Sequence, residues 1–108
     1  MNDIGEEAKL LVEMIVDSYK PDKVILFGSL ARGEIRNDSD IDLLIIKNSD
    51  KKRPFRVKDV FVAIRGLDRR YSLDAIVYTP EELEKRVSLG DYFIHRVLAE
   101  GKVLYGRS

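Results

Sequence analysis

The stretch GSLARGEIRNDSDIDL, residues 28–43, joins two predicted strands. Before it lies KVILF, residues 23–27, a short apolar run rich in strand formers that stops at a glycine, as a buried strand does at a tight turn. The end of the quoted stretch overlaps the second predicted strand, DIDLLII, residues 40–46. This strand is polar at its start and apolar afterwards, a pattern typical of a strand covered on both faces. The pattern therefore predicts a Gly-Ser turn and two aspartates at the same end of a sheet.

The rest of the chain alternates between helical and strand patterns. Helices are predicted over residues 3–19, 54–69 and 88–100 and from Pro80 onward, with a single turn within 29–34; further strands are predicted over 72–78 and 102–105. The clearest boundary is the capping box formed by Thr79 and Glu82. This order of elements predicts the α/β class, with a small mixed β-sheet flanked by helices.

Length and composition limit the classes of protein that need to be considered. The 108 residues suit one domain, residues 1–108, and nineteen Asp and Glu balance nineteen Lys and Arg, which argues against general affinity for nucleic acids or membranes. The absence of cysteine excludes disulfides and thiolate metal sites, so we expect any metal to use oxygen ligands. With a polar, acidic N-terminus and no long apolar run, the expectation is a soluble cytoplasmic protein.

The alternating pair Asp40 and Asp42 in the opening stretch favours a bound cation. Side chains alternate along a strand, so Asp40 and Asp42 project to the same face, where their carboxylates repel. A divalent ion such as Mg²⁺ relieves this repulsion, and it is commonly completed by substrate phosphates. Gly28 lets the backbone approach a phosphate, and the Ser29 hydroxyl can donate to it.

A third carboxylate is needed if two metal ions bridge the attacking and leaving oxygens. Asp74 is the candidate, because it lies at the start of the third predicted strand and paired side chains on neighbouring strands lie about 5 Å apart. In the alternative interpretation, Gly28 and Ser29 form a plain turn and the aspartates cap a buried strand.

With this Gly-Ser pair and these aspartates, the sequence resembles the minimal nucleotidyltransferases of the DNA polymerase β superfamily. These include the MntA-like antitoxins of HEPN/MNT toxin–antitoxin systems. The family signature is Gly-Ser, ten residues and Asp-x-Asp, matched by Gly28, Ser29, Asp40 and Asp42. The surrounding ARGE and SDIDLL are also similar, and LDAIVYTPEEL places Asp74 where the family has its third acid. The resemblance implies the nucleotidyltransferase fold, a mixed sheet flanked by helices.

The resemblance also implies a reaction, in which a hydroxyl attacks the α-phosphate of ATP and pyrophosphate leaves. Asp40, Asp42 and Asp74 would hold the Mg²⁺, expected as two ions, and Asp74 would also receive the proton; Gly28 and Ser29 would hold the phosphates. Arg32 would neutralise the leaving pyrophosphate, or else it is a surface arginine paired with Glu34. The implied acceptor is a tyrosine of a helical HEPN toxin, so that the chain would act as an antitoxin.

Two other functions stay open. The domain could be a non-catalytic nucleotide-binding module that inhibits its partner by occlusion, or a nucleotidyltransferase acting on a small molecule or an RNA end, with a homo-oligomer supplying the acceptor site. Leu89, Tyr92, Phe93 and Val97 offer apolar surface for a partner or for the core.

The remaining polar features carry less information. The basic run KKRPFRVK, residues 51–58, is either a solvated face or a patch for RNA or an acidic partner, and His95 is expected to be a surface or packing residue. We expect no nucleic acid as a direct partner.

Overall fold

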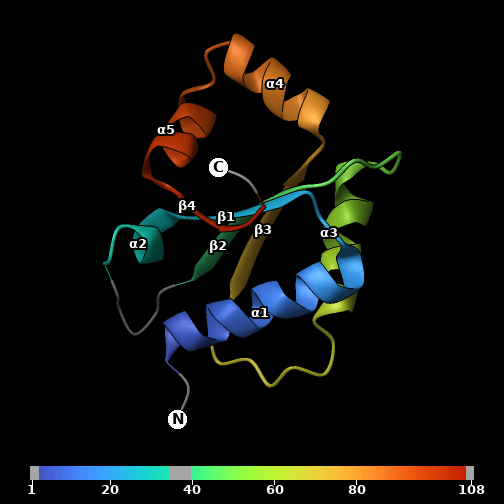
Figure 1. Ribbon diagram of the computed structural model, residues 1–108, viewed down its shortest axis with the longest axis vertical. Coiled ribbons are helices and arrows are strands. Elements are labelled where there is room, and N and C mark those ends of the chain that lie inside the picture. The colour runs from blue at the N-terminus through green and yellow to red at the C-terminus, as the bar shows by residue number, and fades with distance from the viewer. Residues whose placement is uncertain (1–2, 35–39, 107–108) are drawn as a thin grey trace.

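The fold is built on a mixed four-stranded sheet (Figure 1) in a computed structural model that describes residues 3–34 and 40–106. Its strands are β1 (Lys23–Phe27), β2 (Ile41–Ile46), β3 (Leu73–Tyr78) and β4 (Lys102–Tyr105), in the order β3-β2-β1-β4. β1 is antiparallel to both of its neighbours, whereas β2 and β3 are parallel. The expected α/β class and mixed sheet are confirmed.

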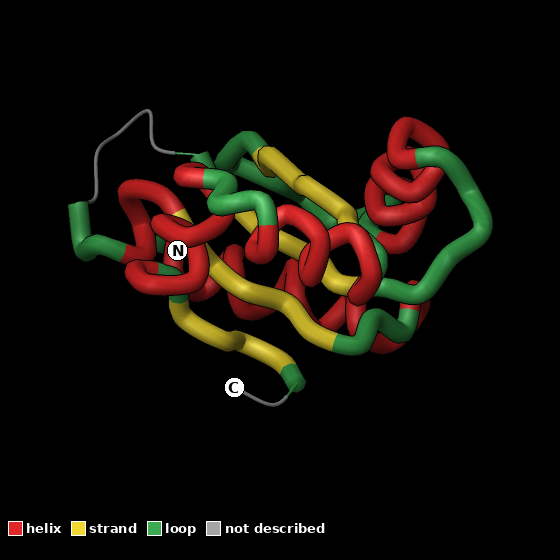
Figure 2. Tube along the Cα trace, turned by 90° about the horizontal axis from the view of Figure 1, so that it is seen from above, coloured by secondary structure: helices red, strands yellow, loops and turns green. Residues whose placement is uncertain are grey.

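Helices cover both faces of this sheet. α1 (Ile4–Tyr19) and α3 (Arg53–Ala63) lie on one face, and α4 (Pro80–Ser88) and α5 (Tyr92–Glu100) lie on the other (Figure 1). The short α2 (Gly28–Ala31) continues directly from β1. β4 forms one edge of the sheet, opposite β3 (the lowest yellow strand in Figure 2), and all four of its residues are exposed.

The apolar run of β2 is explained by these two helical layers. Leu43 and Ile45 join the core beneath α1 and α3, whereas Leu44 and Ile46 join a second core beneath α4 and α5. Alternation along the strand puts Asp42 on the same face as Leu44, and by the same reasoning Asp74 shares a face with Ile76. Both carboxylates therefore belong to the side of the sheet that carries α4 and α5.

A buried carboxylate fixes the segment that leads into β3. Glu7 on α1 is 1% exposed and accepts hydrogen bonds from the backbone N–H groups of Arg70 and Tyr71, at 2.7 and 2.9 Å. Hydrogen bonding satisfies a polar group that would otherwise be costly to bury. The contact holds the chain just before β3 against α1 and so helps to set the position of Asp74.

Most element boundaries agree with the sequence predictions, and two do not. The Thr79–Glu82 capping box is present, but α3 ends at Ala63 rather than at residue 69, and α5 begins at Tyr92 rather than at residue 88. Glycines in the left-handed region, Gly66 at φ 95° and Gly90 at φ 73°, form the turns that stop a helix at these two points. Within the described segments, no helix combines the length and apolar character needed to cross a membrane.

Candidate active site

Gly28 and Asp42 meet where β1 ends and β2 begins. Phe27, the last residue of β1, pairs with Asp42, so Gly28 lies beside that carboxylate. A Cβ atom on Gly28 would be 3.0 Å from Cγ of Asp42 and would overlap its Oδ2 atom. Gly28 also has φ 76°, a conformation that favours glycine. Both the close approach and the backbone conformation therefore require glycine at this position.

Asp42 and Asp74 occupy paired positions on the parallel strands β2 and β3. Adjacent strands lie about 4.8 Å apart, and the two residues share one face of the sheet. The pKa of Asp42 is raised to about 6, first by burial and then by the negative charges of Asp74 and Asp40, whereas Arg32 acts in the opposite direction. Asp40, just before β2, is exposed. The tertiary structure thus brings the three predicted acids into one electrostatic neighbourhood.

The donor atoms of this neighbourhood suit a hard cation. Carboxylate oxygens are the ligands that Mg²⁺ prefers. The pKa of Asp42 is raised first by burial and then by repulsion from Asp74 and Asp40, and a bound cation would offset both effects. Across residues 3–34 and 40–106, no three His, Cys, Asp or Glu side chains converge on a ready-made metal centre. These carboxylates could supply part of a Mg²⁺ site if substrate phosphates and water completed it.

The turn after Gly28 is closed by backbone hydrogen bonds. The N–H of Glu34 donates to the carbonyl of Ser29 at 2.9 Å, and the N–H of Arg32 donates to the carbonyl of Gly28 at 3.2 Å. Ser29 is half-buried at the start of α2, next to Gly28. The chain that follows includes residues 35–39, which lie outside the described part of the structure.

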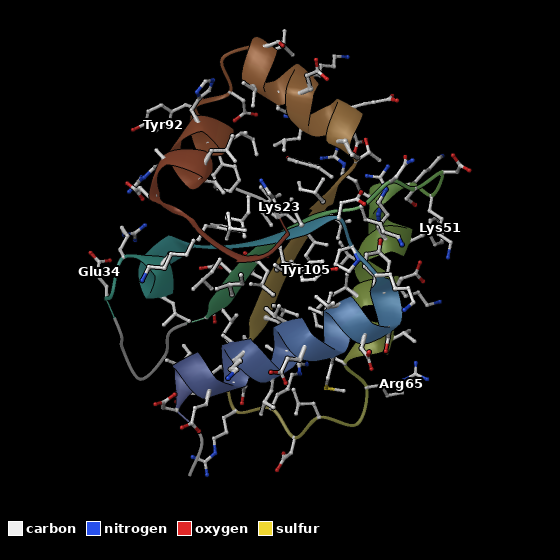
Figure 3. The ribbon with its side chains drawn as sticks, in the orientation of Figure 1. Lys23, Glu34, Lys51, Arg65, Tyr92 and Tyr105 are labelled. Atoms are coloured by element: carbon white, nitrogen blue, oxygen red, sulfur yellow. The ribbon has the colours of Figure 1, made fainter. Side chains whose placement is uncertain are left out.

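Arg32 forms ion pairs and remains close to the acids. Its guanidinium lies 3.2 Å from the Glu34 carboxylate and 3.5 Å from that of Glu100. The sequence left open whether Arg32 pairs with Glu34 or serves the phosphates. The pair with Glu34 is present (Figure 3 labels Glu34 beyond the end of α2), and the positive charge of Arg32 still lowers the pKa of Asp42. Its position is compatible with both functions.

Helix α5 forms a wall of the site that the sequence did not predict. The rings of Phe27 and Phe93 pack edge to face with centroids 5.6 Å apart, and they fix α5 beside the end of β1. A pocket at this contact is lined by Phe27, Gly28, Arg32, Phe93, Arg96, Val97 and Glu100. Arg96 was missed because nothing in its local sequence indicates that α5 packs beside Gly28. The only available signal was its spacing of four residues from Glu100 on one helix face.

The basic run of residues 51–58 does not act as one surface. Lys51 pairs with Asp59 at 2.8 Å, and the guanidinium of Arg56 is buried against the Glu82 carboxylate. The prediction of a solvated face is therefore wrong for Arg56, which is a structural residue. His95 is exposed, with its Nε2 atom 3.1 Å from the carbonyl of Val87, as expected for a surface residue.

A mixed sheet with a Gly-Ser turn facing paired aspartates defines a nucleotidyltransferase. The family of nucleotidyltransferase domains matches residues 8–104, nearly the whole chain, and this chain belongs to that family. The resemblance inferred from Gly28, Ser29, Asp40 and Asp42 is thereby confirmed, and the chain is a nucleotidyltransferase enzyme.

Individual relatives with related names agree with this assignment. "Putative protein adenylyltransferase MJ0604" from Methanocaldococcus jannaschii is 36% identical over 83 residues, which cover 77% of each chain. The crystal structure of a "putative nucleotidyltransferase" from Sulfolobus solfataricus is 28% identical, with a TM-score of 0.61 over 93% of this chain and 78% of that one.

Two toxin–antitoxin crystal structures share the fold at lower identity. One, with AMP-PNP, is 22% identical with a TM-score of 0.64, and the other, a mutant of MntA-HpeT, is 19% identical with a TM-score of 0.65. Each match covers 94% of this chain and 74% of the other. At this level of identity the similarity is one of fold.

Proposed function

We propose that this nucleotidyltransferase transfers AMP from ATP to a tyrosine hydroxyl of a HEPN-family helical toxin and so acts as an antitoxin. The observation that carries the proposal is the pairing of Asp42 with Asp74 on the face of the sheet next to Gly28. The 36% identity to a relative named as a protein adenylyltransferase supports a protein acceptor. The fold shared with toxin–antitoxin structures, one of them with AMP-PNP, supports the partner and the nucleotide.

In the proposed reaction, the acceptor oxygen bonds to the α-phosphorus of ATP as the bond from that phosphorus to the β-phosphate oxygen breaks. Pyrophosphate leaves, and Asp74 takes the hydroxyl proton. Asp40, Asp42 and Asp74 would hold Mg²⁺, which when bound neutralises phosphate charge and favours attack. The backbone of Gly28 and the Ser29 hydroxyl hold the phosphate tail, and Arg32 neutralises the leaving group.

Exposed apolar residues on the second helical layer support a protein partner. Leu89 between α4 and α5 is 72% exposed, and Tyr92 and Phe93 at the start of α5 are 79% and 44% exposed. Figure 3 shows Tyr92 on the outer side of α5. Val97, which the sequence placed in the same group, is buried in the core instead. The three exposed residues belong to the helical layer on the face of the sheet that carries Asp42, so a partner docked on this layer would approach the site from that face.

Labelled ATP provides the test. The chain is incubated with α-phosphate-labelled ATP, Mg²⁺ and the helical protein encoded beside it, and we expect label on a tyrosine of that protein. The double variant Asp40→Asn, Asp42→Asn should abolish the transfer, whereas Asp17→Asn, which neutralises an exposed acid on α1, should not. An ATP reaction in the cytoplasm fits the proposal, and competition with the other nucleoside triphosphates would establish the base.

The occlusion alternative predicts a different outcome. The lack of a ready-made three-ligand metal centre within the described residues is the observation that favours it. If the double variant transfers no label but still neutralises the toxin fully, the chain acts by binding. Label that appears on RNA or on a small molecule instead would establish a different acceptor.

A further inference from the structure

Two arginines beside Gly28 share one carboxylate. Nη1 of Arg32 lies 3.5 Å from Oε2 of Glu100, and Nε of Arg96 lies 3.3 and 3.4 Å from the two oxygens of the same carboxylate. Arg32 follows α2 and Arg96 belongs to α5, so the cluster joins two elements that are distant in sequence. All three residues line the pocket that contains Gly28.

The position of this cluster follows from the packing of α5. Val97 is 4% exposed and Phe93 packs against Phe27, so the helix that carries Arg96 is held against the sheet. The side chain of Arg96 is nevertheless 52% exposed, and that of Glu100 is 38% exposed. Ion pairs as exposed as these are weak and exchange partners readily. The backbone is thus fixed while the charged groups remain available to a ligand.

The chemistry of the cluster matches a phosphate chain. A guanidinium presents a planar fork of N–H donors that fits carboxylate and phosphate oxygens alike. Glu100 therefore occupies the place between the two guanidiniums that a phosphate group could take. A phosphate chain carries more negative charge than one carboxylate, so it would compete successfully for both arginines.

We propose that Arg96 joins Arg32 in binding the phosphate tail of the nucleotide, and that Glu100 positions both guanidiniums until the phosphates displace it. This inference rests on the proposed nucleotide transfer and adds a residue from α5 to its binding site. Arg96 is a binding residue in this proposal, and Glu100 is a positioning residue that competes with the ligand.

The test is a binding measurement with three probes in the presence of Mg²⁺: inorganic tripolyphosphate, AMP-PNP and AMP. Arg96→Gln should weaken the binding of tripolyphosphate and AMP-PNP about tenfold, the lower end of the expected cost of losing one hydrogen bond to a charged group, and should leave AMP binding unchanged. Arg96→Lys keeps the charge without the fork and should give a smaller loss. Glu100→Gln should strengthen the binding of both polyphosphates, because the competing carboxylate is removed.

Arg86→Gln is the matched control. Arg86 belongs to α4 and pairs with Asp91, outside the pocket that contains Gly28, so its loss should leave all three affinities unchanged. Thermal unfolding of each variant checks that the fold is intact.

Two outcomes would overturn the inference: unchanged polyphosphate binding by Arg96→Gln, or weaker binding by Glu100→Gln, which would show that the Arg96–Glu100 pair merely supports α5. A wild-type chain that binds neither polyphosphate would overturn the proposed nucleotide transfer as well, so the two failures are distinguishable.

Discussion

Gly28 and Asp42 approach each other so closely that the glycine has no room for a side chain. The space that a Cβ atom would fill is already taken by the Asp42 carboxylate. The turn that is proposed to hold the phosphates and the strand that carries an acid are therefore built against each other. Substitutions at either residue should therefore change both the stability of the fold and the proposed chemistry.

Gly28→Ala should reduce both stability and transfer. The left-handed backbone conformation costs about 1 kcal/mol or more for a non-glycine residue, and the new methyl group displaces the Asp42 carboxylate. Gly33→Ala is the matched control, because Gly33 has φ 79° but nothing within 4 Å of its added Cβ. Urea unfolding should show similar losses for both variants, and only Gly28→Ala should lose transfer. Equal transfer activity of Gly28→Ala and Gly33→Ala would contradict the steric argument.

The pKa of Asp42 predicts a pH dependence of stability. In the metal-free protein this pKa is raised to about 6, so between pH 4 and 6 the folded state binds more protons than the unfolded state and the free energy of unfolding falls as pH rises. We expect Asp42→Asn to remove this decline and to be more stable than the wild type at pH 7. Urea unfolding at several pH values, with a chelator present, measures both effects. If the free energy of unfolding changed with pH in the same way in the wild type and in Asp42→Asn, the prediction would be refuted.

Asp74→Asn should lower turnover much more than nucleotide binding. Loss of a proton acceptor typically costs a factor of about 10² to 10⁴ in rate, while Asp40 and Asp42 would remain as the proposed metal ligands. Single-turnover transfer and AMP-PNP binding, measured on the same variant, separate the two effects. The control is Asp68→Asn, an exposed acid in the loop before β3, which should behave as the wild type. A full rate with Asp74→Asn would remove Asp74 from the proposed chemistry.

Arg56→Met should be strongly destabilising. The guanidinium donates to the Glu82 carboxylate at 2.6 Å and to the carbonyls of Lys51 and Val77 at 2.7 and 3.2 Å. Arg56 is buried, whereas its partner Glu82 is 38% exposed, so the loss should be about 2 kcal/mol, chiefly from carbonyls left without a donor. Lys51→Met, which breaks an exposed pair with Asp59, should cost less than about 1 kcal/mol. Thermal unfolding of both variants tests the difference. Similar losses of stability in Arg56→Met and Lys51→Met would mean that the buried contacts of Arg56 contribute little to stability.

Tyr92→Ser and Leu89→Ser should weaken capture of the toxin without unfolding the chain. Both side chains are largely exposed on the helical layer that covers the Asp42 face of the sheet, and apolar residues that contact a partner contribute strongly to binding. Phe55→Ser is the control, since Phe55 is 57% exposed but belongs to α3 on the opposite face of the sheet. Affinity measured with the purified toxin should fall only for the first two variants. A comparable loss with Phe55→Ser would move the docking surface to the α3 face.

The sequence predicted those features that depend on neighbours along the chain. β1 and β4 have the predicted bounds, and α4 begins with the capping box read from Thr79 and Glu82. The helix ends at Ala63 and before Tyr92 were predicted wrongly, because an apolar pattern at helical spacing continues through residues whose backbone turns at a glycine. The predicted single domain and the roles of the site residues stay predictions.

By itself, the sequence determined the Gly-Ser turn, the positions of Asp40 and Asp42 at the start of a strand and the family to which the chain belongs. These features could be predicted because local backbone geometry and strand alternation are encoded in adjacent residues. Only the tertiary structure decided that Asp74 pairs with Asp42, that Glu7 holds the segment before β3 and that Arg96 and Glu100 stand beside Gly28. Each of these contacts joins residues far apart in the chain. Their proximity results from the burial of two apolar faces of one sheet under four helices, which no local pattern specifies.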